Sequence, residues 1–197
     1  MPKLVDHSER RQRIIEAAWR LIAERGIDAA TMREIAREAG YANGALTHYF
    51  ADKEALLRAA YEHVYSATNE RVAVAVSGLD GVEALRAFCR EVLPLDDLQL
   101  EEARMVLSVW SRAIVDEALE AVHADSMGVW RSMIVEWLRE GRDLGQVRTS
   151  TTDDVLADQL MTQLMGAQVM ALAGGSAVGP AAQEAVLEEW ISRLARP

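Results

Sequence analysis

The chain of 197 residues has one cysteine, four prolines and fewer basic than acidic residues. Cys89 has no second cysteine to pair with, so an internal disulfide is excluded, and a reducing compartment fits this usage. So few prolines permit long helices almost everywhere. No positively charged and then apolar leader precedes Ser8, which argues against a secretory signal and favours a cytoplasmic location.

The sequence also lacks an uninterrupted apolar run long enough to span a membrane. The segment 159–183 has no formal charge, but a glycine pair and a proline interrupt it, so a helix there should end near Ala173. A membrane-spanning helix needs about 20 mainly apolar residues. We therefore interpret the segment as a buried subunit interface. In a monomer, its apolar face should be exposed, including Leu160, Leu164 and Met165.

Positive charge is unevenly distributed along the chain. The net charge is −10, which by itself argues against a nucleic-acid partner. Residues 1–58, however, contain 10 Lys and Arg against 9 Asp and Glu, whereas residues 59–197 contain 11 against 22. The acidity therefore lies outside the first third, and contact with DNA requires only local positive charge.

Helical periodicity and helix-stop signals run through the whole chain, and no stretch alternates as a strand would. The fold class predicted is all-α, with two domains: residues 1–52 and residues 53–197. We expect about nine helices, at 9–25 with Ser8 as N-cap, 32–39, 45–50, 53–76, 82–93, 98–115, 116–144, 153–173 and 180–194.

The most informative segment is 31–53, TMREIAREAGYANGALTHYFADK. Thr31 and Glu34 fit a capping box, in which each side chain satisfies a backbone donor at a helix start. Gly40 permits a left-handed turn, and Asn43 is a suitable cap for a second helix. Two short helices joined in this way are typical of a helix-turn-helix, although helical proteins of other kinds also contain helix-glycine-helix segments.

The segment as a whole resembles the TetR family of transcriptional regulators. The resemblance covers residues of about 10–58 and lies in the threonine-led helix, the A-G turn and the run G-A-L-T-H-Y-F-A-D-K-E-A-L-L. The H-Y-F ending and two later runs, R-M-V-L-S-V-W-S-R-A-I and H-A-D-S-M-G-V-W-R-S-M-I, are most similar to the BetI-type, choline-responsive branch. Thr47 stands where the family more often has tyrosine.

This resemblance implies a ligand-released repressor that binds a palindromic double-stranded DNA operator as a homodimer. It also implies that the last two helices form the dimer interface and that a small effector, cationic or aromatic, binds the second domain. The alternative is a helical ligand-binding or protein-interaction module that has lost DNA binding. The acidic balance of the chain favours that alternative.

Within the helix-turn-helix, residue chemistry suggests two kinds of DNA contact. Asn43, Thr47 and His48 suit base edges, with Ala45 against a thymine methyl group, and Thr31, Tyr49 and Lys53 suit phosphates. His48 and Tyr49 would alternatively pack between helices. The full set of expected DNA contacts is Thr31, Arg33, Tyr41, Ala42, Asn43, Gly44, Ala45, Thr47, His48, Tyr49 and Lys53.

For the effector, aromatic side chains suit a cation and methionines suit a pocket of adaptable shape. An ordinary helix-bundle core is the alternative reading of the same residues. The expected ligand-binding residues are Phe88, Met105, Trp110, Met127, Trp130, Met161 and Met165, of which Trp110 and Trp130 are the first choices.

Nothing in the sequence nominates an enzyme. The four histidines are scattered and one cysteine cannot build a zinc cluster, so we expect no metal, no cofactor and no catalytic site. The adjacent carboxylates Glu101 and Glu102 are interpreted as solvated charge.

Overall fold

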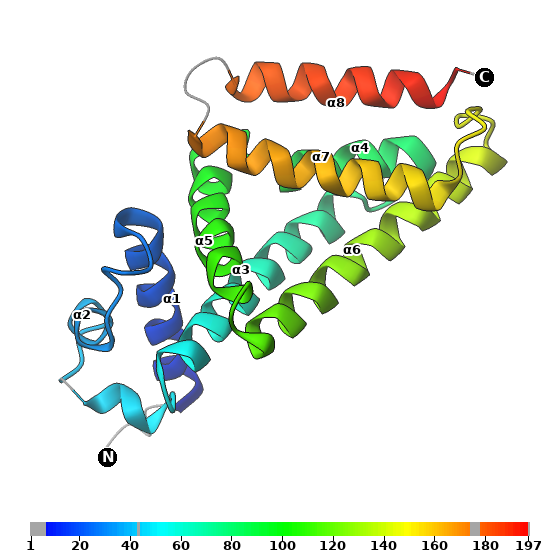
Figure 1. Ribbon diagram of the computed structural model, residues 1–197. Coiled ribbons are helices and arrows are strands. Elements are labelled where there is room, and N and C mark those ends of the chain that lie inside the picture. The colour runs from blue at the N-terminus through cyan, green and yellow to red at the C-terminus, as the bar shows by residue number, and fades with distance from the viewer. Residues whose placement is uncertain (1–6, 43, 174–177, 197) are drawn as a thin grey trace. The chain divides into compact units, whose positions relative to one another are not determined.

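The computed structural model describes residues 7–42, 44–173 and 178–196. Over these residues the fold is all-α, as predicted, with no strand, and Figure 1 shows its helices. None of them is both long and apolar enough to cross a membrane. The elements are α1 (His7–Arg25), α2 (Met32–Glu38), the 3-10 helix η1 (Ala45–His48), α3 (Lys53–Ala75), α4 (Gly81–Val92), α5 (Asp97–Ala113), α6 (Glu117–Asp143), α7 (Asp153–Ala173) and α8 (Pro180–Leu194).

The chain divides into two compact units. Unit 1 comprises Met1–Ser66 and Arg104–Val122, and unit 2 comprises Ala67–Ala103 and His123–Pro197. Helices α3, α5 and α6 therefore each contribute residues to both units. A segment from the middle of the sequence belongs with the N-terminal helices, which sequence periodicity gave no reason to expect.

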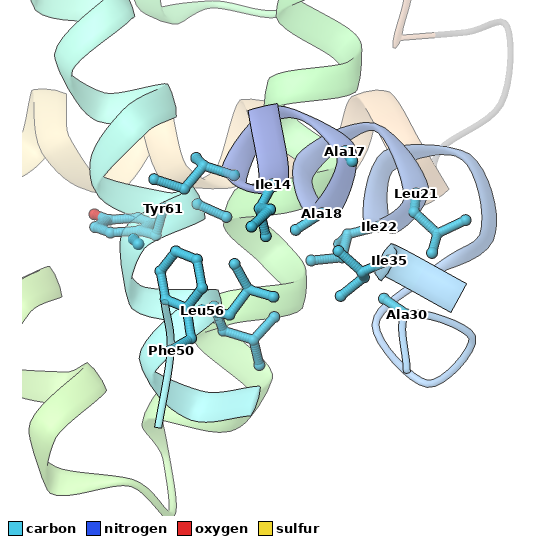
Figure 2. Close-up of a cluster of buried hydrophobic side chains, with 14 of the residues drawn as sticks. Ile14, Ala17, Ala18, Leu21, Ile22, Ala30, Ile35, Phe50, Leu56 and Tyr61 are labelled. Carbon is cyan, nitrogen blue, oxygen red and sulfur yellow. The ribbon is translucent and has the colours of Figure 1, made fainter. Parts of the chain in front are cut away.

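One hydrophobic core holds unit 1 together. Along α1, buried residues recur at Ile14, Ala18 and Leu21, the spacing of one helical face. Figure 2 shows these side chains meeting residues from the other elements of the unit. The core also contains residues from every other part of the unit. They include Ile35 from α2, Leu46 from η1, Phe50 just before α3, Leu56 and Leu57 in the first turns of α3, and Met105, Val109 and Leu119 from the segment Arg104–Val122.

Local signals set most of the helix ends in unit 1. Gly26 and Gly40 have φ values of 80° and 77°, so each reverses the chain after a helix as predicted. The first helix begins at His7, so the prediction of Ser8 as its N-cap is wrong: Ser8 already lies within the first turn.

The predicted capping box at α2 forms only by half. The Thr31 Oγ1 accepts a hydrogen bond from the Glu34 N–H at 3.2 Å. The Glu34 carboxylate does not return to the Thr31 backbone, because it pairs instead with the Arg37 guanidinium one turn later. The Thr31 N–H donates to the Ala29 carbonyl at 2.9 Å, so its donor is already satisfied.

In unit 2, α7 and α8 form an antiparallel pair. The Arg148 and Thr149 N–H groups, which precede α7, both donate to the carbonyl of Leu194 at the end of α8. Figure 1 shows the two helices as the orange and red pair. Helix α4 packs against α8, where Arg86 pairs with Glu188 at 2.9 Å.

The expectation that Leu160 and Leu164 lie on an exposed face is wrong. Both are buried within a single chain, with exposed fractions of 0 and 1 %. They lie on the side of α7 that faces its own bundle, since Leu156 is buried one turn earlier on the same face. The exposed apolar residues of α7 are instead Val155, Val169 and Met170.

Candidate nucleic-acid interface and aromatic cluster

Residues 44–49, which we call the recognition segment, follow the turn after α2. The expected helix over 45–50 is in fact a four-residue 3-10 helix, η1. It begins after Gly44 at φ 92°, and the buried side chains of Leu46 and Phe50 attach it to the core of unit 1. Such 3-10 helices are short because their hydrogen-bond geometry is poorer than that of an α-helix. The predicted site residue Asn43 lies outside the described residues.

Thr47 and His48 are both exposed on this segment. The Thr47 hydroxyl donates to the carbonyl of Gly44 at 2.7 Å. Tyr49 is half-buried, and its ring centroid lies 5.7 Å from that of His7 in α1. His48 is therefore not packed between helices, whereas Tyr49 packs partly against the first helix.

The flanking residues of the predicted interface differ in exposure. Thr31, Arg33 and Ala42 are exposed, as is Gly44. Tyr41 is half-buried and packs against the core of unit 1, and its N–H donates to the carbonyl of Ala36 at 2.8 Å. That bond fixes the Tyr41 backbone against the end of α2.

Positive charge beside the recognition segment comes from Lys53 and Arg11. The Lys53 ammonium donates to the carbonyl of Ile27 at 2.7 Å, which ties the start of α3 to the loop after α1. An ammonium has three N–H donors, so this bond leaves capacity for a phosphate. The Arg11 guanidinium lies 5.0 Å above the centre of the Phe50 ring. Asp52 caps α3 as predicted, accepting from the Ala55 N–H at 2.7 Å.

Unit 2 contains a cluster of three aromatic side chains around Phe88. The rings of Phe88 and Trp130 meet edge to face at 5.5 Å, and Trp137 lies 5.4 Å from Phe88. The Trp130 indole N–H donates to the Asn69 side-chain carbonyl at 2.8 Å. Phe88 is 0 % and Trp130 6 % exposed, so the cluster is part of the interior of unit 2.

The other predicted ligand-binding residues do not all join this cluster. Met127, Met161 and Met165 are half-buried residues of unit 2. Met105 belongs to unit 1, where it is fully buried in the core, and the half-buried Trp110 belongs to the same unit. The structure thus groups Phe88 with Trp130 and places Met105 in the core of unit 1.

The expectation that Glu102 is solvated is wrong. Its side chain is buried and accepts two hydrogen bonds from the Arg71 guanidinium, at 2.9 and 2.7 Å, and Thr68 donates to it at 3.4 Å. Arg71 also donates to Glu91 at 3.1 Å. Burial lowers the pKa of Arg71, but the bonds and charges of Glu102 and Glu91 outweigh it, so the pKa is raised overall. Two carboxylates around one guanidinium leave a net negative charge.

A sequence signal for Glu102 existed. On α5 it precedes Met105 and Val109 by three and seven residues, the spacing of one helical face, and both of these are fully buried. A carboxylate within an apolar stripe requires a buried partner. Asn69, the partner of Trp130, carries no comparable signal, because only the folded chain brings α3 and α6 together there.

Family comparisons identify two regions of the chain. Residues 14–60 match the model described as bacterial regulatory proteins of the tetR family, and residues 81–196 match the C-terminal region of BetI-type transcriptional repressors. The first match covers most of the helix-turn-helix and its core. The second covers more than half of the chain.

Similar proteins carry related names. The regulator PksA of Bacillus subtilis is 39 % identical over 111 residues, which are 56 % of this chain and 52 % of PksA. BetI of Serratia proteamaculans is 35 % identical over 58 % of this chain and 59 % of its own length. The chain thus spans about half to three fifths of these two relatives. BetI of Burkholderia thailandensis is 30 % identical over 71 % of this chain and 73 % of its own.

Solved structures share the fold over almost the whole chain. A transcriptional regulator from Saccharomonospora viridis, crystallised in complex with choline, has a TM-score of 0.89 at 26 % identity and covers 94 % of this chain and 97 % of its own. A regulator from Rhodococcus sp. Rha1 has a TM-score of 0.83 at 24 % identity, and the match covers 93 % of this chain and 95 % of that regulator.

Proposed function

The chain belongs to the TetR family of bacterial transcriptional regulators, and from this premise we propose that it is a ligand-released repressor that binds a palindromic DNA operator as a homodimer. The observation that carries the proposal is the recognition segment, in which buried Leu46 anchors the exposed pair Thr47 and His48. A rigidly anchored, exposed polar pair is what reading of base edges requires. We place the DNA-binding domain at residues 1–52, the effector and dimerisation domain at 53–197, and the protein in the cytoplasm, where bacterial DNA lies.

We assign two roles to the DNA contacts. Thr47, His48 and Ala45 read base edges, together with Asn43. Thr31, Arg33, Tyr49 and Lys53 hold phosphates, because hydroxyl, guanidinium and ammonium groups donate to phosphate oxygens without reading sequence. Tyr41 contacts a base or sugar, and Ala42 and Gly44, which are small and exposed, allow the backbone to approach the duplex.

The homodimer would use exposed uncharged side chains of α7 and α8. No formal charge occurs in residues 159–183, and the exposed apolar residues within and beside this segment are Val169 and Met170 on α7 and Val186 on α8. Exposed apolar side chains that share two adjacent helices favour a protein interface over solvent. In such a two-fold interface, the same pair of helices from each subunit packs together.

The effector would be cationic. The aromatic cluster of Phe88, Trp130 and Trp137 groups in one unit the kind of rings that attract a quaternary ammonium. The net negative charge around Glu102 lies in the same unit. Thr68, which donates a hydrogen bond to Glu102, is next in sequence to Asn69, which accepts one from Trp130. The similar S. viridis regulator was crystallised with choline, which has this chemistry. We include Met127, Met161 and Met165, which belong to the same unit, among the effector contacts. Met105 and Trp110, which belong to unit 1, stay predictions that this arrangement does not use.

A gel-shift titration with the region upstream of the coding sequence tests DNA binding. A sequence-selective shift that weakens steeply with salt is expected for several phosphate contacts. A folded dimer that shifts no duplex even at low salt would instead support the module without DNA binding. Val169→Glu, which puts a charge into the proposed interface, should convert the dimer to monomer in sedimentation analysis.

The effector proposal has a separate test. Choline and a series of other quaternary amines are added to the DNA complex, and release is measured by fluorescence anisotropy. Trp130→Leu should raise the amine concentration needed to release the DNA, while leaving the affinity for DNA without amine unchanged. Neutral compounds of similar size are the control, and release by these alone would contradict the cationic assignment.

A further inference from the structure

The hydroxyl group of Thr47 lies within hydrogen-bond distance of a backbone carbonyl of its own segment. Its Oγ1 lies 2.7 Å from the carbonyl oxygen of Gly44, a normal distance for an O–H···O hydrogen bond. A carbonyl oxygen carries no hydrogen, so Thr47 must be the donor of this bond. The hydroxyl hydrogen is therefore directed to the backbone of its own segment, while the side chain itself is exposed.

This direction limits what Thr47 can offer to a bound duplex. With its hydrogen committed, the hydroxyl oxygen has only lone pairs left and acts as an acceptor. In the major groove, guanine presents acceptors at N7 and O6 and thymine presents the acceptor O4, whereas adenine N6 and cytosine N4 are amino donors. Phosphate oxygens are acceptors as well. Thr47 therefore matches an exocyclic amino group and neither guanine nor phosphate.

We propose that Thr47 selects, in each half-site of the operator, a base with an exocyclic amino group, adenine N6 or cytosine N4. The inference rests on the proposed function, since it concerns the recognition segment bound to DNA. To donate a hydrogen bond to guanine, thymine O4 or phosphate, the Thr47 hydroxyl would have to break its hydrogen bond to the Gly44 carbonyl. A net intramolecular hydrogen bond corresponds to about a two- to twelve-fold factor in an equilibrium constant, which is the size of the discrimination expected.

The test begins with selection of duplexes from a randomised pool by the full chain. The selected half-site should contain a position of adenine or cytosine whose preference disappears in Thr47→Val, which removes the hydroxyl but keeps a similar shape. Thr47→Ser, which keeps the hydroxyl, should keep the preference. Circular dichroism and thermal melting confirm that the variants are folded.

Base analogues then identify the amino group. Replacing that adenine by 2′-deoxynebularine, or that cytosine by 2′-deoxyzebularine, removes only the exocyclic amino group. Made in one half-site, this replacement should weaken DNA binding by the wild type and by Thr47→Ser about two- to twelve-fold. DNA binding by Thr47→Val should not change. Whichever analogue has this effect decides between adenine and cytosine.

Three results would overturn the inference. One is equal sensitivity of the wild type and Thr47→Val to the analogues, and another is a Thr47-dependent preference for guanine or thymine. The third is a Thr47-dependent loss on replacing a single phosphate by methylphosphonate, which would make Thr47 a phosphate donor. If the wild type selects no sequence at all, the proposed function itself fails and this inference falls with it.

Discussion

Replacing Gly81 by alanine should destabilise unit 2 strongly. Gly81 opens α4 with φ +57°, and its N–H donates to the Glu140 carboxylate at 3.0 Å. The next N–H, of Val82, donates to the Gln146 side-chain oxygen at 2.9 Å. A β-carbon added at Gly81 would lie 2.5 Å from that same oxygen and 3.0 Å from the Cα of Gly141. The side chain of Gln146 can move, but the backbone of Gly141 cannot.

The magnitude follows from these contacts. A left-handed conformation costs a residue with a β-carbon about 1–2 kcal/mol. If Gln146 moves away, the buried Val82 N–H loses its acceptor, which costs about 1–3 kcal/mol. Alanine restricts the unfolded chain, which offsets about 0.4–1 kcal/mol. The net loss in the free energy of unfolding is about 1–5 kcal/mol, or about 2–20 °C in melting temperature for a chain of this size.

Urea denaturation followed by circular dichroism, at one fixed protein concentration, measures this loss. Gly128→Ala is the matched control. Gly128 lies within α6 with nothing within 4 Å of its added β-carbon, so the substitution should stabilise by about 0.5–1 kcal/mol. Gly81→Ala combined with Gln146→Ala should cost less than the sum of the single changes, because both remove the acceptor of the Val82 N–H and Gln146→Ala also removes the oxygen that the new β-carbon meets. A Gly81→Ala protein as stable as the wild type would refute the reasoning.

Three further predictions concern buried charge, pH and capping. Arg71→Met should lower the free energy of unfolding by about 2–4 kcal/mol, because it leaves the carboxylate of Glu102 buried without its partner; adding Glu102→Gln should recover most of the loss in urea denaturation. Burial lowers the pKa of His123 below its ordinary value of 6.5. Below that pH the unfolded chain therefore binds more protons than the folded chain, and stability falls on acidification. His123→Gln should flatten the dependence of melting temperature on pH between about pH 7 and 5, and an unchanged slope would contradict this origin. Thr31→Ala should cost about 1 kcal/mol of local stability in α2, seen as faster hydrogen exchange of the Glu34 amide, whereas Thr31→Ser should exchange like the wild type.

Much of the fold and of the candidate interface was predictable because the signals are local. A glycine after a helix, as at Gly26 and Gly40, reverses the chain through its own φ angle. Asp52 caps α3 and Pro180 opens α8 at the predicted positions, because each depends on hydrogen bonds or dihedral angles within one turn.

Only the tertiary structure decided where competing partners go and which apolar face is covered. Glu34 pairs with Arg37 instead of completing a capping box, and Leu160 is buried within the single chain instead of lying on an exposed face. The pairing of Glu102 with Arg71, and of Trp130 with Asn69, joins residues 31 and 61 positions apart in sequence. The sequence by itself determined the helices and the helix-turn-helix, since caps, glycines and periodicity act within a few residues. Burial and pairing depend on which distant helices meet, so they had to come from the folded chain.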